Sequence, residues 1–218
     1  MNFIDIHTHK KKETDCIEIL NIFAQDLRDD RELPLCTAGF HPWHIDQHDE
    51  RETINRLHQY SDHPHILAIG ECGLDLAIGN DREKQERIFL KQAGISENKK
   101  KPLLIHCVKA HNELIRLQKL VRANMPWVIH AYSAKPATTR MLQNHRFYFS
   151  FGESLLKEKR GLIDSLRMIP PEKIFFETDE SDVSVAEIYF FAAKILKMDV
   201  EMLKKQIFEN YKQVFRNG

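Results

Sequence analysis

The sequence predicts an α/β fold of the TIM-like (β/α)8 barrel type, distorted or truncated in its first βα unit. Short apolar runs typical of β-strands alternate with amphipathic stretches, which favours βαβ units and a parallel sheet. The 218 residues are 42% apolar and include 13 Phe, enough for one sizeable core, so we expect a single domain over residues 1–218. Histidines and carboxylates also stand repeatedly where these runs end, the position of active sites in such barrels.

Seven runs have the composition of buried strands, because they are rich in Ile, Leu, Val and Phe and stop at polar or turn residues. They cover residues 3–7, 35–41, 66–71, 102–107, 127–132, 147–152 and 173–179.

An eighth segment, residues 16–23 (CIEILNIF), is compatible with either a strand or a short helix. About eight residues separate it from the first run, whereas a parallel crossover normally takes a dozen or more. This connection is too short for a helix. Residues 10–34 are therefore expected to hold an irregular, even antiparallel, part of the barrel.

The helices carry recognisable start signals. Residues 81–97 have apolar positions at helical spacing, Ser184 with Glu187 forms a capping box, and Asp199 is placed to cap a last helix. The apolar stripe of that last helix is Leu203, Ile207, Tyr211 and Phe215.

Charge and hydropathy narrow the class of protein. Lys and Arg number 32 and so do Asp and Glu, so no global positive field draws the chain to nucleic acid, and an anionic substrate has to be held locally. No apolar run reaches the roughly 18 residues of a membrane span, and we expect a cytoplasmic protein with no membrane partner.

Six metal-binding side chains stand at the ends of the apolar runs. His7 and His9 alternate onto the same face of the first strand. An isolated HxH pair is common by chance, but the recurrence at the same end of strand after strand is not, because buried charges without a metal or a partner cost several kcal/mol each. The other four side chains are Glu71, His106, His130 and Asp179.

Four imidazoles and two carboxylates exceed the ligand set of a structural zinc and suit two divalent ions that share a carboxylate. Glu71, from a middle strand, is the best bridge. Such a pair lowers the pKa of a bound water and neutralises charge on a phosphoryl or carbonyl oxygen, which predicts hydrolysis. Histidine ligands favour Zn or Mn, with Mg as the alternative.

The motifs IDIHTH, AGFHPW, AIGECGLD, LLIHC, IHAYS, FYFSFG and FFETD resemble, in this order, those of the TatD family of metal-dependent hydrolases. These are TIM barrels of the amidohydrolase superfamily that act mostly as deoxyribonucleases. The resemblance implies that His7, His9 and Asp179 bind one ion, that His106 and His130 bind the other, and that Glu71 touches both. It also implies that Asp179 accepts a proton from the attacking water.

Three further residues are assigned supporting roles. By the resemblance, His41 contacts a substrate phosphate; the alternative is that it orders the loop before Pro42. Strand alternation places Asp5 and Glu177 inward beneath the ligands, where they would accept hydrogen bonds from ligand imidazoles or stay protonated or water-bonded. One departure concerns the substrate cleft: after Asp179 the chain passes through ESDV directly to the helix near Ser184, whereas the family has a longer Pro-containing loop.

Three functions follow from these observations. The first is a TatD-like deoxyribonuclease that cleaves phosphodiester bonds of single-stranded DNA or DNA ends with a metal-activated water. The second is a hydrolase of a small phosphoester, amide or lactone, which the shortened last loop would accommodate. The third, of another class, is a catalytically idle barrel that binds metal or a partner.

Overall fold

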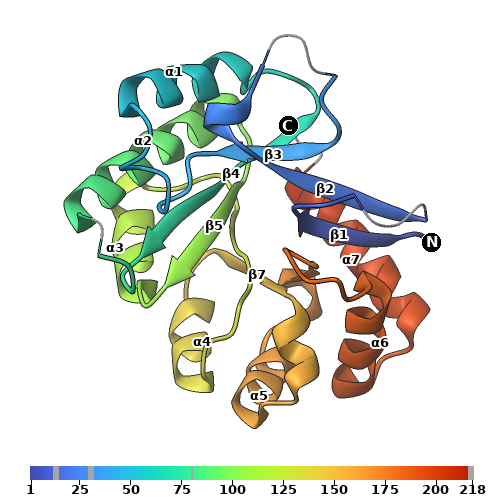
Figure 1. Ribbon diagram of the computed structural model, residues 1–218. Helices are drawn as coiled ribbons and strands as arrows, with labels where there is room; N and C mark the ends of the chain where they lie inside the picture. Colours follow the sequence, from blue (N-terminus) through green and yellow to red (C-terminus); the bar gives the residue numbers. More distant parts are fainter. Residues whose placement is uncertain (12–14, 29–31, 80, 216–218) are drawn as a thin grey trace. The chain divides into compact units, whose positions relative to one another are not determined.

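The computed structural model of the chain describes residues 1–11, 15–28, 32–79 and 81–215. Eight strands within these residues form one sheet in the order β1 to β8, and helices follow most of the strands (Figure 1). This alternation is the topology of the predicted (β/α)8 barrel class. The strands are β1 (Phe3–Thr8), β2 (Cys16–Phe23), β3 (Cys36–Gly39), β4 (Ile66–Asp75), β5 (Leu103–Val108), β6 (Trp127–Ile129), β7 (Phe147–Phe151) and β8 (Ile174–Phe176).

Seven α-helices and three short 3-10 helices connect the strands in the described residues. The α-helices are α1 (Glu50–Tyr60), α2 (Arg82–Lys99), α3 (His111–Val121), α4 (Pro136–Gln143), α5 (Arg160–Met168), α6 (Val185–Leu196) and α7 (Val200–Phe215). The 3-10 helices are η1 (Ala24–Asp26), η2 (Glu153–Lys157) and η3 (Pro171–Lys173). None of these helices is both long and apolar enough to cross a membrane.

The chain divides into two compact units. One comprises Met1–Leu20 and Ile129–Asn217, and the other Asn21–Val128. The single domain expected over residues 1–218 stays a prediction.

In the first unit, α6 and α7 pack against β1 and β8 (Figure 1). Tyr189 of α6 is fully buried, and its hydroxyl accepts from the Ile4 N–H at 3.3 Å and donates to the Ile4 carbonyl at 3.0 Å. The predicted caps at Ser184 and Asp199 are confirmed: the Ser184 side chain accepts from the Ala186 N–H, and Asp199 accepts from the first N–H groups of α7. The part of Glu187 in a capping box stays a prediction. The predicted apolar stripe of α7 is buried.

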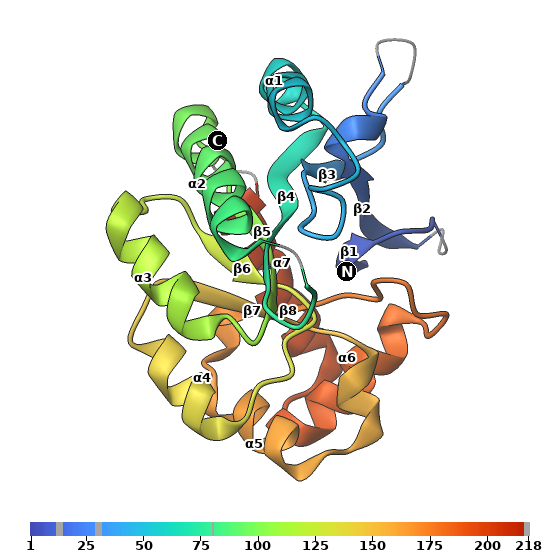
Figure 2. The ribbon, with the colours of Figure 1, turned by 60° about the vertical axis from the view of Figure 1, so that its left-hand side comes forward.

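In the second unit, β3, β4 and β5 are neighbouring parallel strands, and α2 covers β4 (Figure 2). Two glycines permit this approach. A Cβ on Gly39 would lie 2.6 Å from the Glu71 carbonyl oxygen, and one on Gly73, whose φ is +152°, only 1.9 Å from that of His106. Any side chain at either position would push a ligand-bearing strand away.

Residues 16–23 form strand β2, which pairs with β1 in parallel through Phe3 and Cys16. The alternative of an antiparallel segment, or of a short helix, is therefore wrong. The expected truncation is confirmed, because the connection from Thr8 to Cys16 spans seven residues and cannot hold a full crossover helix. The pairing of β1 with β2 has a register shift between Asp5 and Thr8.

Several strand ends differ from the predicted ones. β3 ends at Gly39 and β6 at Ile129, so His41 and His130 follow their strands. β4 continues to Asp75, four residues beyond Glu71, because parallel pairing with β5 extends through Asp75 and Val108. β8 ends at Phe176, so Asp179 lies in the segment after the strand rather than at its last position.

Candidate metal centre

His7, His9 and Asp179 form one group in the first unit. Asp179 Oδ1 lies 3.5 Å from His7 Nε2 and 3.3 Å from His9 Nε2. The two imidazoles come from one face of β1 and its continuation, with ring centroids 5.1 Å apart. His7 is fully buried, whereas His9 and Asp179 are half-buried, so the group has an open side.

The backbone of Asp179 is fastened to β1. Its N–H donates to the His7 carbonyl at 2.9 Å, and its carbonyl accepts from the His9 N–H at 3.2 Å. Its φ is +54°, in the left-handed region that Asp and Asn enter more readily than most residues. The two hydrogen bonds and this turn together direct the carboxylate at both imidazoles.

The pKa of Asp179 reflects this position. Burial raises the pKa of the carboxyl, but hydrogen bonds from His7 and His9 outweigh that effect and hold the pKa well below its usual range. The side chain is therefore an anion flanked by imidazoles, a donor arrangement suited to a cation.

His130 and Glu177 lie beside this group, in the same unit. The His130 ring is 4.6 Å from that of His7, centroid to centroid, and its Nδ1 lies 3.4 Å from Glu177 Oε1. The same carboxylate oxygen accepts from the Ala131 N–H. Glu177 thus lies within ion-pair distance of an imidazole, and its expected role of orienting that ring stays a prediction.

Asp5 supports the group through the backbone. Its carboxylate accepts from the N–H of His7 at 3.2 Å, and from the N–H and hydroxyl of Thr178 at 3.1 and 2.6 Å. The interactions described for this carboxylate fix the two segments that carry His7 and Asp179, rather than an imidazole. Burial raises the pKa of Asp5 to about 7 despite these donors.

His41, Glu71 and His106 form another group, in the second unit. Glu71 is buried in β4, and its Oε1 lies 2.9 Å from both His41 Nε2 and His106 Nδ1. The Trp43 N–H donates to His41 Nδ1 at 3.2 Å, which assigns the proton to Nε2 and makes His41 a donor to Glu71. His41 thereby holds the Glu71 carboxylate in place.

Asp75 extends this group and is a residue that was not predicted from the sequence. Its Oδ2 lies 3.3 Å from His106 Nε2 and accepts from Trp43 Nε1 at 2.8 Å. Burial raises the pKa of Asp75, but the Trp43, Ala77 and His106 hydrogen bonds lower it below the usual range. The sequence ECGLD could have indicated Asp75, because residues two apart in a strand share a face, and Glu71, Gly73 and Asp75 therefore point to the same side.

Two buried glutamines of α2 hold the ends of the neighbouring strands. Gln92 accepts from the Phe40 N–H at 2.8 Å and donates to the Phe40 carbonyl at 3.0 Å. Gln85 makes the same pair of bonds with Asp75, at 2.8 and 3.1 Å. Gln92 fixes the backbone of Phe40, next to His41, and Gln85 fixes that of Asp75, so α2 positions both site residues.

Comparison with known proteins identifies the family. Residues 19–216 match the family described as TatD related DNase. The chain belongs to the TatD DNase family. The match begins within β2, so His7 and His9 precede it, and the resemblance predicted from the motifs is confirmed.

The relatives of this TatD chain include proteins named as nucleases and one named as a metal-dependent hydrolase. An uncharacterized metal-dependent hydrolase of Buchnera aphidicola is 28% identical over 83% of this chain and 74% of its own length. The 3'-5' ssDNA/RNA exonuclease TatD of Escherichia coli is 31% identical over 66% of this chain, but the match spans only 56% of that protein. This chain shares the family of metal-dependent hydrolases with these relatives. The exonuclease activity is that of the E. coli protein.

Solved TatD structures share the fold. YjjV, a TatD homologue of E. coli, superimposes with a TM-score of 0.82 over 99% of this chain and 98% of its own, at 16% identity. A TatD family hydrolase of Entamoeba histolytica gives a TM-score of 0.74 over 98% of each chain, at 17% identity. At such low identity these likenesses confirm the barrel class alone.

The donor chemistry of this TatD chain fits divalent cations. In each unit three ligand atoms, one per residue, lie within 4.8 Å of one another: His7, His9 and Asp179 in one, His41, Glu71 and His106 in the other. Imidazole nitrogens with carboxylate oxygens are the ligands that Zn and Mn prefer. The first group, and Glu71 with His106 in the second, are thus built from donors that could hold an ion, whereas His41 uses its Nε2 proton on Glu71 and its Nδ1 on the Trp43 N–H.

Proposed function

We propose that this TatD chain hydrolyses phosphodiester bonds of DNA, on single strands or at ends, with two divalent metal ions of the Mg, Mn or Zn class. One observation carries the proposal: a chain of this DNase family presents two groups of histidine and carboxylate side chains, and in one of them imidazoles lower the pKa of the Asp179 carboxyl. A phosphodiester needs its charge neutralised and a water activated, and paired cations supply both when bound.

The proposed ligands follow the predicted assignment. His7, His9 and Asp179 hold one ion, His106 and His130 hold the other, and Glu71 contacts both. The contacts of His7 and His9 with Asp179, and of His106 with Glu71, support it. Contact of Glu71 with both ions stays a prediction.

The remaining roles belong to side chains rather than ions. Asp179 accepts a proton from the attacking water, as a carboxylate kept ionised by its neighbours can do. Glu71 contributes to catalysis as a buried carboxyl group whose direction His41 controls. His41 is also the proposed contact for a substrate phosphate, and Asp5 and Glu177 keep the ligands oriented.

A metal and activity measurement tests the proposal. Purified chain is expected to contain or take up divalent metal by elemental analysis and to release nucleotides from single-stranded DNA with Mg or Mn. Asp179→Asn and His106→Gln should each lower that rate by roughly 100-fold or more, because each removes a group in contact with the reacting site. His58→Gln, an exposed histidine of α1, is the matched control and should leave the rate unchanged.

Two outcomes would contradict the proposal. Equal activity of the wild type, Asp179→Asn and His106→Gln would remove the assigned site. A chain that holds no metal and takes up none would instead be the idle barrel considered above.

A second candidate is hydrolysis of a small phosphoester, amide or lactone. A pocket of about 270 Å³ lies beside Asp179, walled by η2 and the short connection to α6. Its size suits one small ligand. Turnover of small esters by a metal-loaded chain that releases no nucleotides from DNA would favour this candidate.

A further inference from the structure

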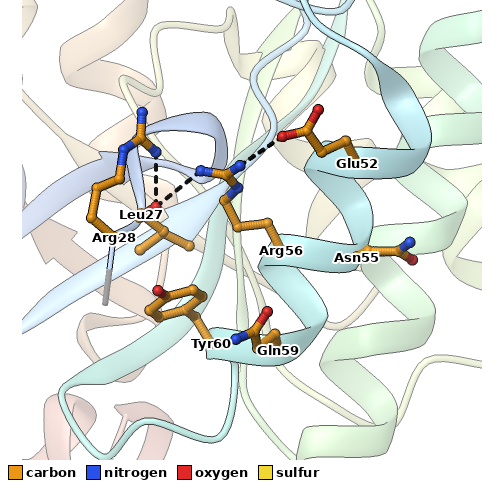
Figure 3. Close-up of a pocket in the computed structure, with 7 residues that line it drawn as sticks. All are labelled: Leu27, Arg28, Glu52, Asn55, Arg56, Gln59 and Tyr60. Atoms are coloured by element: carbon orange, nitrogen blue, oxygen red, sulfur yellow. Dashed lines mark hydrogen bonds and ion pairs between the residues drawn. The ribbon is translucent and has the colours of Figure 1, made fainter. Parts of the chain in front are cut away.

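A polar pocket of about 350 Å³ lies in the second unit, between α1 and the segment after η1 (Figure 3). Leu27 and Arg28 line it from that segment, and Glu52, Arg56 and Tyr60 from α1. None of these residues belongs to the candidate metal centre. The volume is at the small end of ligand sites, the scale of one nucleotide.

Two arginines converge in this pocket on one acceptor. The Leu27 carbonyl accepts from Arg28 Nη1 at 2.8 Å and from Arg56 Nη1 at 3.2 Å, and both guanidinium groups also reach the Gln25 carbonyl. Two cations this close repel each other, so an anion between them would be favourable. A guanidinium has five N–H donors, and the two carbonyls use few of them.

The contacts of the two arginines differ. Glu52 pairs with Arg56 at 2.7 Å and offsets one cation. In the part of the chain that the structure describes, Arg28 donates to backbone carbonyls and to no carboxylate. Arg28 is also exposed, so its remaining donors can reach a ligand. A chain with no net charge has to hold an anionic substrate through local donors of this kind.

Tyr60 adds an aromatic surface to the pocket. Figure 3 shows its ring on the same side of α1 as the two guanidinium groups. Guanidinium groups for a phosphate beside an aromatic ring for a base are the combination that single-stranded nucleic acids bind.

The pocket is joined to the His41 and Glu71 group within the second unit. Gln25, whose carbonyl accepts from both arginines, pairs through its side chain with His44 Nδ1 at 2.9 Å. The Phe23 ring packs on His44 and His41, at centroid distances of 4.5 and 6.1 Å. Phe23 and Gln25, at and just after the end of β2, therefore connect the arginine pocket with the His41 and Glu71 group.

We propose that Arg28 and Arg56 bind a backbone phosphate of single-stranded nucleic acid at a subsite outside the cleaved bond, with a base against Tyr60. The inference rests on the proposed function and extends it, because it names the residues that select a strand over a small ester.

Binding of a phosphorothioate-linked (dT)12 oligonucleotide, which resists hydrolysis, tests the subsite with the full metal-loaded chain. Arg28→Gln and Arg56→Gln should each weaken binding by about 5- to 10-fold and reduce the dependence of log K on log salt by roughly 0.7 per lost phosphate contact. Arg51→Gln, an exposed arginine of α1 outside the pocket, should change neither. Turnover of bis(p-nitrophenyl) phosphate should be unchanged in all three variants, since it has no second phosphate.

Each result decides between alternatives. If the wild type degrades DNA while Arg28→Gln binds the oligonucleotide with unchanged affinity and salt dependence, the subsite is wrong and the proposed function stands. An equal loss of affinity in Arg51→Gln would also overturn it, because the effect would be general surface charge. If the wild type degrades no nucleic acid, the proposed function fails, and selective loss of oligonucleotide binding in the pocket variants still supports the arginine site.

If Arg56→Gln unfolds, the binding measurement on Arg28→Gln alone decides the test, because Arg28 is exposed.

Discussion

At the scale of single residues, the candidate site depends on backbone conformation as much as on side-chain type. Asp179 directs its carboxylate at two imidazoles because its backbone turns through a φ of +54° and is held on both sides by β1. Most L-residues resist this conformation, at a cost of about 1 kcal/mol. The residue type at this position is therefore constrained twice, by chemistry and by geometry.

A comparison of glycine and alanine at position 179 separates these constraints. Both Asp179→Gly and Asp179→Ala remove the carboxylate, but only glycine relieves the positive φ. We expect the free energy of unfolding of Asp179→Gly to exceed that of Asp179→Ala by about 1 kcal/mol in urea denaturation.

The control for this comparison is Asp164 in α5, where the backbone is helical. There Asp164→Gly should be less stable than Asp164→Ala by about 1 kcal/mol, the reverse order. The same order at both positions would show that the backbone of Asp179 does not impose the expected constraint.

At the scale of elements, α2 joins the core to the candidate site through two buried amides. Gln85 and Gln92 are seven residues apart, which is two turns along one face of the helix. Each side-chain amide bonds to a backbone N–H and carbonyl at the end of a strand, where no neighbouring strand supplies these partners. The helix thereby fixes where β3 and β4 stop.

Loss of one of these amides should be costly. In Gln92→Met the side chain keeps its size, but the N–H and carbonyl of Phe40 lose both partners in a buried place. We expect the free energy of unfolding to fall by about 2–4 kcal/mol, measured in urea. Gln59→Met on the exposed face of α1 should change it by less than about 0.5 kcal/mol. Equal, small effects would mean that the Phe40 backbone finds other partners.

An ion-pair cluster connects α1 with α2 and predicts a pH effect. Glu50 contacts Arg87 at 2.8 Å and Lys91 at 2.6 Å, and the hydrogen bond from Arg87 is the main cause that lowers its pKa to about 2. A depressed carboxyl pKa stabilises the fold above the unfolded value, and this contribution is lost as pH falls from about 4.5 toward 2.

Glu50→Gln should therefore be less stable than the wild type at pH 7 and approach it at pH 3.5. Because the cluster is on the surface, we expect a difference of at most about 1 kcal/mol at pH 7. Denaturant unfolding at the two pH values measures it. A difference that grows on acidification would refute the assignment to Glu50.

At the scale of the whole molecule, the ligand residues are drawn from both ends and the middle of the chain. His7 and Asp179 lie in one compact unit, and Glu71 and His106 in the other. Cations bound by the folded chain and not by the unfolded one would add to its stability.

Metal removal should therefore lower the melting temperature. We expect chelator-treated chain to melt several degrees lower than metal-loaded chain, and added Mn or Zn to restore the difference, with about 2.7 kcal/mol gained at 100 times Kd. Asp179→Asn should reduce the restored shift, whereas His58→Gln should keep it. A melting temperature unchanged by metal in the wild type would contradict cation binding by the folded state.

Much of the fold and of the candidate site could be predicted from the sequence, because the relevant signals are local. Apolar runs give strands their composition, period-two alternation puts His7 and His9 on one face, and Ser184 and Asp199 cap their helices through neighbouring N–H groups. The two runs that carry Glu71 and His106 were predicted to lie in one parallel sheet, so the meeting of these side chains was also predictable, although β4 and β5 continue past them.

Only the tertiary structure decided the features that depend on contacts between distant segments. Residues 16–23 are a strand because β1 offers them a partner, and the local composition favoured neither state. Gln85 and Gln92 bond to Asp75 and Phe40, which lie 10 and 52 residues away in the sequence. Arg28 and Arg56 meet because both donate to the Leu27 carbonyl. A sequence pattern records which side chain a residue carries and which face it takes; the partner it meets is set by how the strands and helices pack.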